Sequence, residues 1–406
     1  MLNGSLVMLL GSGLVAGLNF AYNLAVARLL GPTGFGHACA VFTVLMLASA
    51  VALSFQLICA KFVARNASSG GRSAVYRGLS RQAWIVGIGM GLALALFSRE
   101  TARYLRLPSA TLVLLLACGL AFYVPLGVRR GGMQGVCAFG RLSWSFVIEV
   151  VVKLVGAVGF IALGFSTAGV VAAISLSVIA VYFLPVPREL SSAPGGGEPA
   201  SFREGLQAIV FFAGQVVINN VDILLVKHFF PPDQAGVYAA IALVGRVVYL
   251  LSWSVVSAMF PISAAEKAEK ESSSLLLPPV LLVLGIAVVF TLGLGFSPQN
   301  VLDLLFGSAF GTAVQGVGPM LALYAASTGF YSLSVVLIAY EMSRRIANTA
   351  WLQLVISGLI VGGIYLFHAS LQQVILVQLV LMSLLLIAVS FPFVTAKRPA
   401  PCPEAL

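Results

Sequence analysis

The stretch from Asn19 to Ala40, NFAYNLAVARLLGPTGFGHACA, returns 200 residues later from Asn219 to Ala240 as NNVDILLVKHFFPPDQAGVYAA. Six of the 22 paired positions are identical, and among them Pro32 and Gly36 each pair with a residue of their own type. In both copies an apolar run reaches a proline, and a glycine and a new apolar run follow. Duplication around a central interface is typical of transporters that hold their substrate near the middle of the bilayer.

The composition is that of an integral membrane protein. The chain has 406 residues, of which 60% are hydrophobic and 9% are charged, and its mean hydropathy is +1.04. Soluble domains carry about 25% charged residues. Because only helices and closed barrels satisfy the backbone in lipid, and a helix needs about 20 apolar residues to cross, we predict an all-α polytopic fold with twelve spans. The predicted spans are residues 5–28, 38–60, 83–98, 110–127, 143–164, 168–186, 206–229, 237–260, 275–296, 314–340, 346–367 and 371–393.

The basic residues gather in alternate loops. The net charge is +10, but its placement argues against a nucleic-acid partner. Lys61 to Arg81 and the pair Arg129 and Arg130 are two such clusters. Cationic loops stay in the cytoplasm, so we predict a multi-pass protein of the inner membrane with both termini cytoplasmic. The loop from Arg99 to Arg106, on the predicted outer side, departs from this rule.

The twelve spans fall into two equal sets. Between them lies Ser191 to Ala200, SSAPGGGEPA, which has the composition of a flexible linker. We predict a six-helix lobe at 1–190, a hinge at 191–204, a six-helix lobe at 205–396 and a cytoplasmic tail at 397–406, with a central cavity between the lobes. The cysteines and histidines show no metal-ligand or redox spacing, and no nucleophile–base set is visible, so we predict no metal, no cofactor and no enzyme activity.

Polar residues form stripes on two equivalent spans. In the first span, Asn19 and Asn23 lie on one face, because four residues return to the same side of a helix. In the seventh, Gln215, Asn219 and Asp222 share a face. We interpret both stripes as cavity linings. The alternative is that the amides join helices by hydrogen bonds, which is a common role for them in membranes.

Arg246 is the most informative single residue. It follows Gly236 by ten residues, which places it about 15 Å along the eighth span, near the bilayer midplane. Arginine is costly there and needs a partner or a wet cavity. Tyr249 follows on the same face. The alternative to a substrate contact is an ion pair with Asp222 that locks two helices together.

Three further charged residues are candidates. Glu149 and Lys153 lie four apart in the fifth span, in the order that favours a salt bridge. Their pairing is either structural, a gate, or a substrate contact. Arg28 lies near the predicted outer end of the first span, where its side chain could also reach toward the headgroups.

These residues carry a resemblance to a known family. ARLLGPTGFGHACAVFTV (Ala27 to Val44) resembles the first-repeat signature of the oligosaccharide flippases, of the O-antigen export type. The stretch from Asn219 to Ala264 is similar to their signature for the seventh and eighth spans, with N-x-x-D, P-x-x-x-G-x-Y, a mid-helix arginine and the closing Pro261. This family belongs to the multidrug/oligosaccharidyl-lipid/polysaccharide (MOP) exporter superfamily.

The resemblance implies two six-helix lobes around a V-shaped cavity that opens alternately to each side. It implies a substrate, a polyprenyl-pyrophosphate-linked oligosaccharide, that moves from the inner to the outer leaflet. It also implies cavity roles for Arg246 and Asp222, and Arg28 matches the arginine of the first signature. The expected partners are the lipid-linked oligosaccharide, membrane lipids, and the polymerase and glycosyltransferases of the same pathway, with the chain itself a monomer.

Three other functions stay open at this point. A cation-coupled drug or metabolite antiporter of the same fold needs a carboxylate in a lobe, and Glu149 is the only one in the first lobe's spans. A membrane-embedded glycosyltransferase or polymerase needs a sizeable outer loop, and the outer loops are short. A scaffold without transport would have no use for charges in a cavity.

Overall fold

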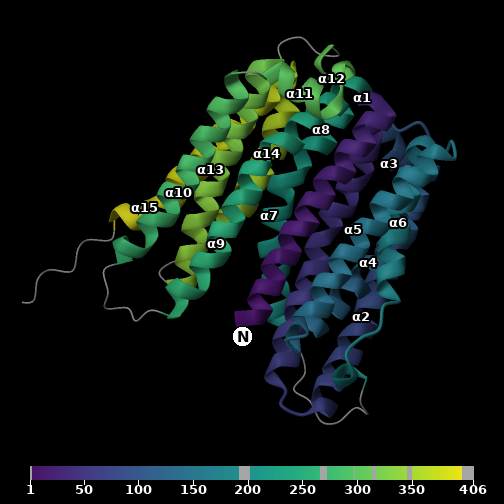
Figure 1. Cartoon of the computed structure of the whole chain (residues 1–406), viewed down its shortest axis with the longest axis vertical. Helices are drawn as coiled ribbons and strands as arrows, with labels where there is room; N and C mark the ends of the chain where they lie inside the picture. The colour runs from purple at the N-terminus through teal and green to yellow at the C-terminus, as the bar shows by residue number, and fades with distance from the viewer. Residues whose placement is uncertain are drawn as a thin grey trace, which may run out of the picture. The chain divides into compact units, whose positions relative to one another are not determined.

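The computed structural model describes residues 2–191, 202–265, 272–296, 298–312, 317–344 and 350–395 (Figure 1). Helix accounts for 91% of the described residues, which contain no strand. Within these residues, eight helices are long and apolar enough to cross a membrane, and two shorter apolar helices accompany them. The predicted all-α membrane fold is confirmed.

The chain forms two compact units. Unit 1 comprises Met1–Ala242 with Gln299–Val317, and unit 2 comprises Leu243–Pro298 with Gly318–Leu406. The helices of unit 1 are α1 (Leu2–Arg65), α2 (Ser69–Leu96), α3 (Ser98–Tyr104), α4 (Thr111–Gly135), α5 (Phe139–Ala162), α6 (Ser166–Tyr182), α7 (Phe202–Phe229), most of α8 (Pro232–Gly245), most of α11 (Pro298–Phe306) and α12 (Ser308–Thr312). Those of unit 2 are α9 (Val247–Ala265), α10 (Ser272–Phe296), nearly all of α13 (Val317–Arg344), α14 (Ala350–Leu366) and α15 (Leu371–Thr395). The division into lobes at 1–190 and 205–396 stays a prediction, and residues 192–201 of the predicted hinge lie outside the described part of the chain, as does the predicted tail.

The helix boundaries differ from the predicted spans at two places, Gly31 and Arg246. The first and second spans belong to one long helix, α1, which is interrupted at Gly31, where φ is 68°. A left-handed φ is accessible to glycine without steric cost. The eighth span is divided at Arg246 into α8 and α9. With α1 counted as two spans and α8 with α9 as one, the helices are consistent with the twelve spans predicted.

The cytoplasmic loop predicted around the basic cluster Lys61 to Arg81 and the short third span at 83–98 are corrected by α2, which begins at Ser69. The side chain of Ser68 accepts a hydrogen bond from the backbone N–H of Gly71 at 3.0 Å and caps the helix. Apolar residues within the polar stretch, Val75 and Leu79 among them, pack in a buried cluster with the end of α1. The prediction of a loop followed from the basic residues of the segment. It did not take into account the apolar residues between them, which form one buried face of the helix.

The two copies of the repeat meet within unit 1. A methyl group added at Gly36 would lie 2.8 Å from the carbonyl oxygen of Pro232, and one added at Gly236 would lie under 3.0 Å from that of Pro32. The backbones therefore approach so closely that both positions require glycine. The helix is interrupted at equivalent positions in the two copies. In the first, α1 is interrupted at Gly31, next to Pro32, and in the second, α7 ends just before Pro232.

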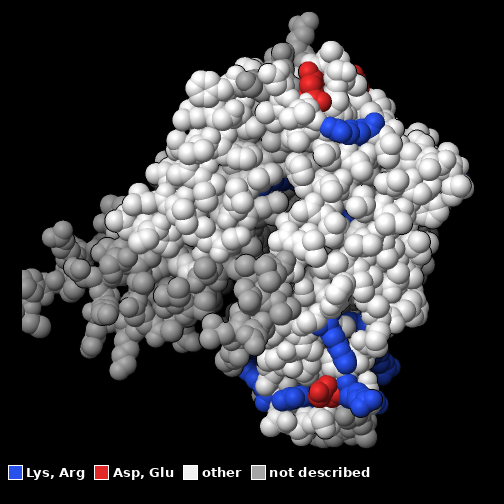
Figure 2. Space-filling model, in the orientation of Figure 1, with Lys and Arg blue, Asp and Glu red and all other residues white. Residues whose placement is uncertain are grey.

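Basic side chains gather at one end of unit 1. Figure 2 shows Lys and Arg concentrated at the end where α1 gives way to α2. The exposed residues of this group are Lys61, Arg65, Arg77, Arg81, Arg141 and Arg188. The opposite end of unit 1 carries the turn of α1 at Gly31, the short helices α3, α11 and α12, and the start of α8 (Figure 1). The positive end is the one predicted to face the cytoplasm.

Candidate functional site

Lys153 lies inside unit 1, on α5. Its side chain is 4% exposed, and its amine donates a hydrogen bond of 2.6 Å to Oδ1 of Asn19 on α1. The amine also lies 4.5 Å from the ring centroid of Tyr22 and 4.9 Å from that of Phe42, distances typical of cation–π contacts. Nine residues of α5 follow it, so it stands about 14 Å from the helix end, near the middle of a span. The structure thus joins two predicted site residues, Asn19 and Lys153.

The predicted salt bridge between Glu149 and Lys153 is corrected. The carboxylate of Glu149 pairs with the guanidinium of Arg130 on α4, while Lys153 donates to Asn19. Arg130 is 6% exposed, and its Nε also donates to Oγ of Ser145 at 3.3 Å. Because buried charges are ordinarily paired, Arg130 accounts for the carboxylate.

Arg130 was expected in a cytoplasmic loop after a span that ends at residue 127. Instead α4 continues to Gly135. Methyl groups added at Gly127, Gly131 or Gly135 would each lie under 3.0 Å from a backbone carbonyl oxygen of α1. Three glycines at a spacing of four let the two helices approach closely, and this spacing is the sequence signal that would have extended the span.

The asparagines of the first stripe bond mainly to their own helix. The amide nitrogens of Asn19 and Asn23 donate to carbonyls one turn earlier, at 3.0 and 2.8 Å. This leaves Oδ1 of Asn19 free to accept from Lys153. In the second stripe, the amide of Asn219 donates to the carbonyl of Gln215 at 2.8 Å. Both of these residues are half-buried, and their facing a cavity stays a prediction.

Asp222 is a buried acid of unit 1. Its side chain is 0% exposed, and its carboxylate accepts a hydrogen bond of 3.1 Å from the hydroxyl of Tyr238. This bond ties α7 to α8. Arg246 belongs to unit 2, so the ion pair weighed for these two residues stays a prediction.

Arg246 lies at the junction of α8 and α9, within unit 2. Its Nε donates to the hydroxyl of Tyr324 on α13 at 3.1 Å. The ring of Tyr324 packs directly on Gly245, where a methyl group would come under 3.0 Å from its Cδ1. The glycine therefore lets α13 approach closely enough for its phenol to reach the guanidinium. The expectation of an arginine inside an unbroken helix is corrected, because the helix is interrupted at this residue.

Tyr249 extends this site within unit 2. Its ring stacks on that of Tyr331 with centroids 5.5 Å apart, and the hydroxyl of Tyr331 donates to Oε1 of Gln353 at 3.3 Å. Trp253 lies beyond, with its centroid 6.0 Å from that of Tyr249. Arg246, Tyr249 and Trp253 are partly exposed, whereas Tyr331 and Gln353 are buried. A guanidinium can bind an anionic group through charge-assisted hydrogen bonds.

Arg28 has a structural role. It donates from Nε to the carbonyl oxygen of Leu305 at 2.8 Å and from Nη2 to that of Leu304. These are among the last carbonyls of α11, which a cation at a helix C-terminus stabilises. These contacts anchor the guanidinium to α11, and its reach toward the headgroups stays a prediction.

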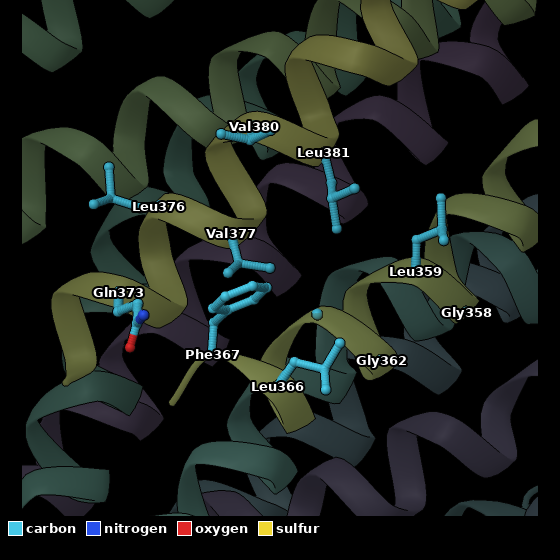
Figure 3. Close-up of a pocket in the computed structure, with 11 residues that line it drawn as sticks. Gly358, Leu359, Gly362, Leu366, Phe367, Gln373, Leu376, Val377, Val380 and Leu381 are labelled. Atoms are coloured by element: carbon cyan, nitrogen blue, oxygen red, sulfur yellow. The ribbon is translucent and has the colours of Figure 1, made fainter. Parts of the chain in front are cut away.

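An apolar groove of about 540 Å³ lies between α14 and α15 in unit 2 (Figure 3). Its floor includes Gly358 and Gly362, and Leu366, Phe367 and Val380 line its walls. Of the lining side chains only Gln373 is polar. The groove suits hydrocarbon, and it offers no charge for a phosphate.

Solved structures match the whole chain. The lipid II flippase MurJ in its inward closed conformation gives a TM-score of 0.76 at 11% identity, over 97% of this chain and 88% of that one. MATE in its straight conformation gives 0.63 at 14% identity, over 97% and 96%. An outward-facing multidrug resistance MATE family transporter of the MOP superfamily gives 0.61 at 15% identity, over 96% and 93%. No protein-family model and no curated protein matches the chain.

At these identities the likeness shows the fold. The chain has the fold of MOP-superfamily transporters, and its helices cover nearly the full length of their structures. The fold is the one expected from the signatures. The oligosaccharide flippase branch is a matter for the proposed function.

Proposed function

We propose that this protein is a flippase that moves a polyprenyl-pyrophosphate-linked oligosaccharide from the inner to the outer leaflet of the bacterial inner membrane by alternating access. The observation that carries the proposal is the environment of Lys153. It is a buried cation near the middle of a span, and its hydrogen-bond partner is a neutral amide oxygen. A charge in such a place is functional by default.

The pyrophosphate is the part of the substrate that such cations suit. Its charge must cross about 30 Å of hydrocarbon, and charge-assisted hydrogen bonds to phosphate are the strong ones. Within unit 1, Lys153 would bind the phosphate and the amides of Asn19, Asn23, Gln215 and Asn219 would receive the sugar. Within unit 2, Arg246 would bind the phosphate and the ring of Tyr249 would receive the sugar. Asp222, Glu149 and Arg28 would then support the site through the contacts they make with protein groups.

Export of surface polysaccharide in a complemented deletion strain tests the proposal. We expect Arg246→Ala to abolish export while the protein level in the membrane stays normal. Wild-type export by this variant would remove Arg246 from the mechanism. The neutral variant Lys61→Gln, at the exposed basic end of unit 1, is the control for a general loss of positive charge.

A cation-coupled antiporter is the second candidate, and Asp222 is the observation that favours it. Its carboxylate is fully buried and accepts a hydrogen bond from a neutral phenol, a setting in which a proton or sodium ion could bind. Drug sensitivity of a deletion strain with intact surface polysaccharide would support this function. Loss of polysaccharide with unchanged drug sensitivity would support the flippase.

A further inference from the structure

Two buried basic side chains of unit 1 take no part in the proposed transport site. Lys227 on α7 is 0% exposed and His37 on α1 is 8% exposed. Nζ of Lys227 and Nδ1 of His37 have no hydrogen-bond partner within the described part of the chain. Buried polar groups are nearly always hydrogen-bonded, and an unpaired buried cation is costly. Two such nitrogens on the packed helices α1 and α7 point to a ligand.

Their position is defined by the contact between the two copies of the repeat. His37 directly follows Gly36, whose Cα faces the backbone of Pro232 and Gly236. Lys227 precedes Pro232 by five residues, on the helix that enters the same turn. Both residues therefore lie in the part of unit 1 where the two copies of the repeat meet.

The repeat shows that the polar pair is specific to one copy. In the other copy the equivalent positions, 200 residues away, are Ala27 and Val237. Both of these side chains are 0% exposed and apolar. The equivalent location in the other copy is therefore packed by two apolar side chains. This indicates that packing of the repeat does not require a lysine and a histidine.

The charges around Lys227 leave an excess of cations. The positive charge of Arg106 and the negative charge of Asp233 both act on Lys227, and Lys227 in turn acts on His37. Among the described residues Lys227 and Asp233 form no ion pair with each other. Arg106 and Lys227 carry like charges, and an anion bound between them would offset their repulsion.

Arg106 is held at the rim by its neighbours. It has a left-handed backbone, with φ at 48°, and its Nη1 donates to the carbonyl of Phe230 at 3.5 Å. Tyr104 ends α3 two residues before Arg106, and its ring stacks on that of His228 with centroids 3.9 Å apart. The carbonyl oxygen of Tyr104 lies 2.8 Å from Nδ1 of His228. These contacts fix the exposed guanidinium beside the end of α7.

We propose that Lys227 and His37, with Arg106 at the rim, form an anion-binding site for a phosphate group in this part of unit 1. The ligand is the phosphate of a lipid headgroup or of the lipid-linked substrate of the proposed function, and the second case rests on that function. Arg106 is exposed and Lys227 is covered, so the phosphate meets the arginine first. It reaches the amine once the segment after α3 shifts aside.

Binding of inorganic pyrophosphate to the purified full chain tests the site. Maltoside micelles carry no phosphate, so calorimetric titration in them reports only the added ligand. We expect saturable binding that Lys227→Met weakens by about tenfold or more, the loss of one charge-assisted bond, and that His37→Gln weakens to a smaller extent. Arg103→Gln, on α3 and exposed, removes the same charge from the surface and should leave binding unchanged. No saturable binding, or equal weakening by Arg103→Gln and Lys227→Met, would overturn the site.

Thermal unfolding in the same micelles keeps the result interpretable. Because Lys227→Met removes an unpaired buried charge, we expect it to unfold at the same temperature as wild type or higher. Pyrophosphate should raise the midpoint of wild type more than that of Lys227→Met. A variant that fails to fold would show that the amine is needed for packing and would overturn the proposal.

Two competition arms separate the sources of the phosphate. Displacement of pyrophosphate by phosphatidylglycerol in the micelles identifies a lipid headgroup, and displacement by a polyprenyl phosphate alone identifies the substrate. Failure of both lipids to compete would overturn the lipid assignment. Since the assay measures binding without transport, it is independent of the export experiment on Arg246, and either proposal can fail without the other.

Discussion

The amine of Lys153 on α5 lies 2.6 Å from Oδ1 of Asn19 on α1, and this hydrogen bond joins two helices through a neutral acceptor. The acid one turn away, Glu149, is bound by Arg130 from α4. Among the residues that the structure describes, no carboxylate lies at hydrogen-bond distance from the lysine. A cation held in this way can exchange its amide partner for a phosphate at a smaller cost than breaking an ion pair.

Replacement of Lys153 by Met should therefore abolish export while the protein still folds. The methionine side chain is nearly as long and can still pack on Tyr22 and Phe42, but it loses the charge and with it the cation–π contacts. We expect at least a tenfold fall in export, about the worth of one charge-assisted bond. The measurement is surface polysaccharide per unit of membrane-inserted protein. Asn19→Leu, which removes the acceptor but leaves the charge, should lose less, and equal export by Lys153→Met and wild type would contradict the assignment.

The pair of Arg130 and Glu149 should act on stability. Arg130→Met leaves a buried carboxylate without its partner, which costs about 3–5 kcal/mol. We expect a large fall in the midpoint of thermal unfolding in detergent. The double variant Arg130→Met with Glu149→Leu should recover much of it, because no unpaired charge is left. If the double variant is less stable than Arg130→Met alone, the pair is not the source of the effect.

The sequence was sufficient to predict the helical fold and the repeat, because both depend on local sequence patterns that do not require knowledge of how the helices pack. Apolar runs of the length of a bilayer predict spans, and proline with glycine at matching positions predicts the turns at Pro32 and Pro232. The close contact of Gly36 and Gly236 was not predicted. It depends on how two distant segments pack against each other. The alignment of the two copies shows which positions are equivalent, but not which are in contact.

The site was predicted only in part, because the sequence does not specify which helices lie next to each other. Spacing by four places Glu149 and Lys153 on one face, but the partner of each is chosen by the neighbouring helix. Arg130 was counted among the loop charges, because positive residues at the end of an apolar run are ordinarily cytoplasmic. Its burial follows from the glycines of α4, whose effect appears only once α1 is packed against them.

The glycine contact between the repeats gives a third prediction. In Gly236→Ala the new methyl group would lie under 3.0 Å from the carbonyl of Pro32, and backbone can move aside only at a cost. We expect a loss of about 1–3 kcal/mol, measured by thermal unfolding. Gly89→Ala is the matched control, since a methyl group there meets nothing within 4 Å and alanine favours helix. A Gly236→Ala protein as stable as the control would contradict the close approach.

Gly245 should affect export through the residue beside it. A methyl group at this position would come under 3.0 Å from Cδ1 of Tyr324, so Gly245→Ala must displace the ring whose hydroxyl accepts from Nε of Arg246 at 3.1 Å. The loss of a hydrogen bond to a charged group is worth about 1.5–3 kcal/mol, and we expect export to fall by about tenfold or more.

Tyr324→Phe separates the hydrogen bond from the packing, because it removes the hydroxyl and keeps the ring on Gly245. We expect it to reduce export as much as Gly245→Ala does. The double variant should be no worse than either single one, since residues that act through one shared contact are not additive. Export that falls in the double variant by the product of the two single effects would mean that Gly245 acts elsewhere. The guanidinium of Arg246 would then be positioned by other groups of unit 2.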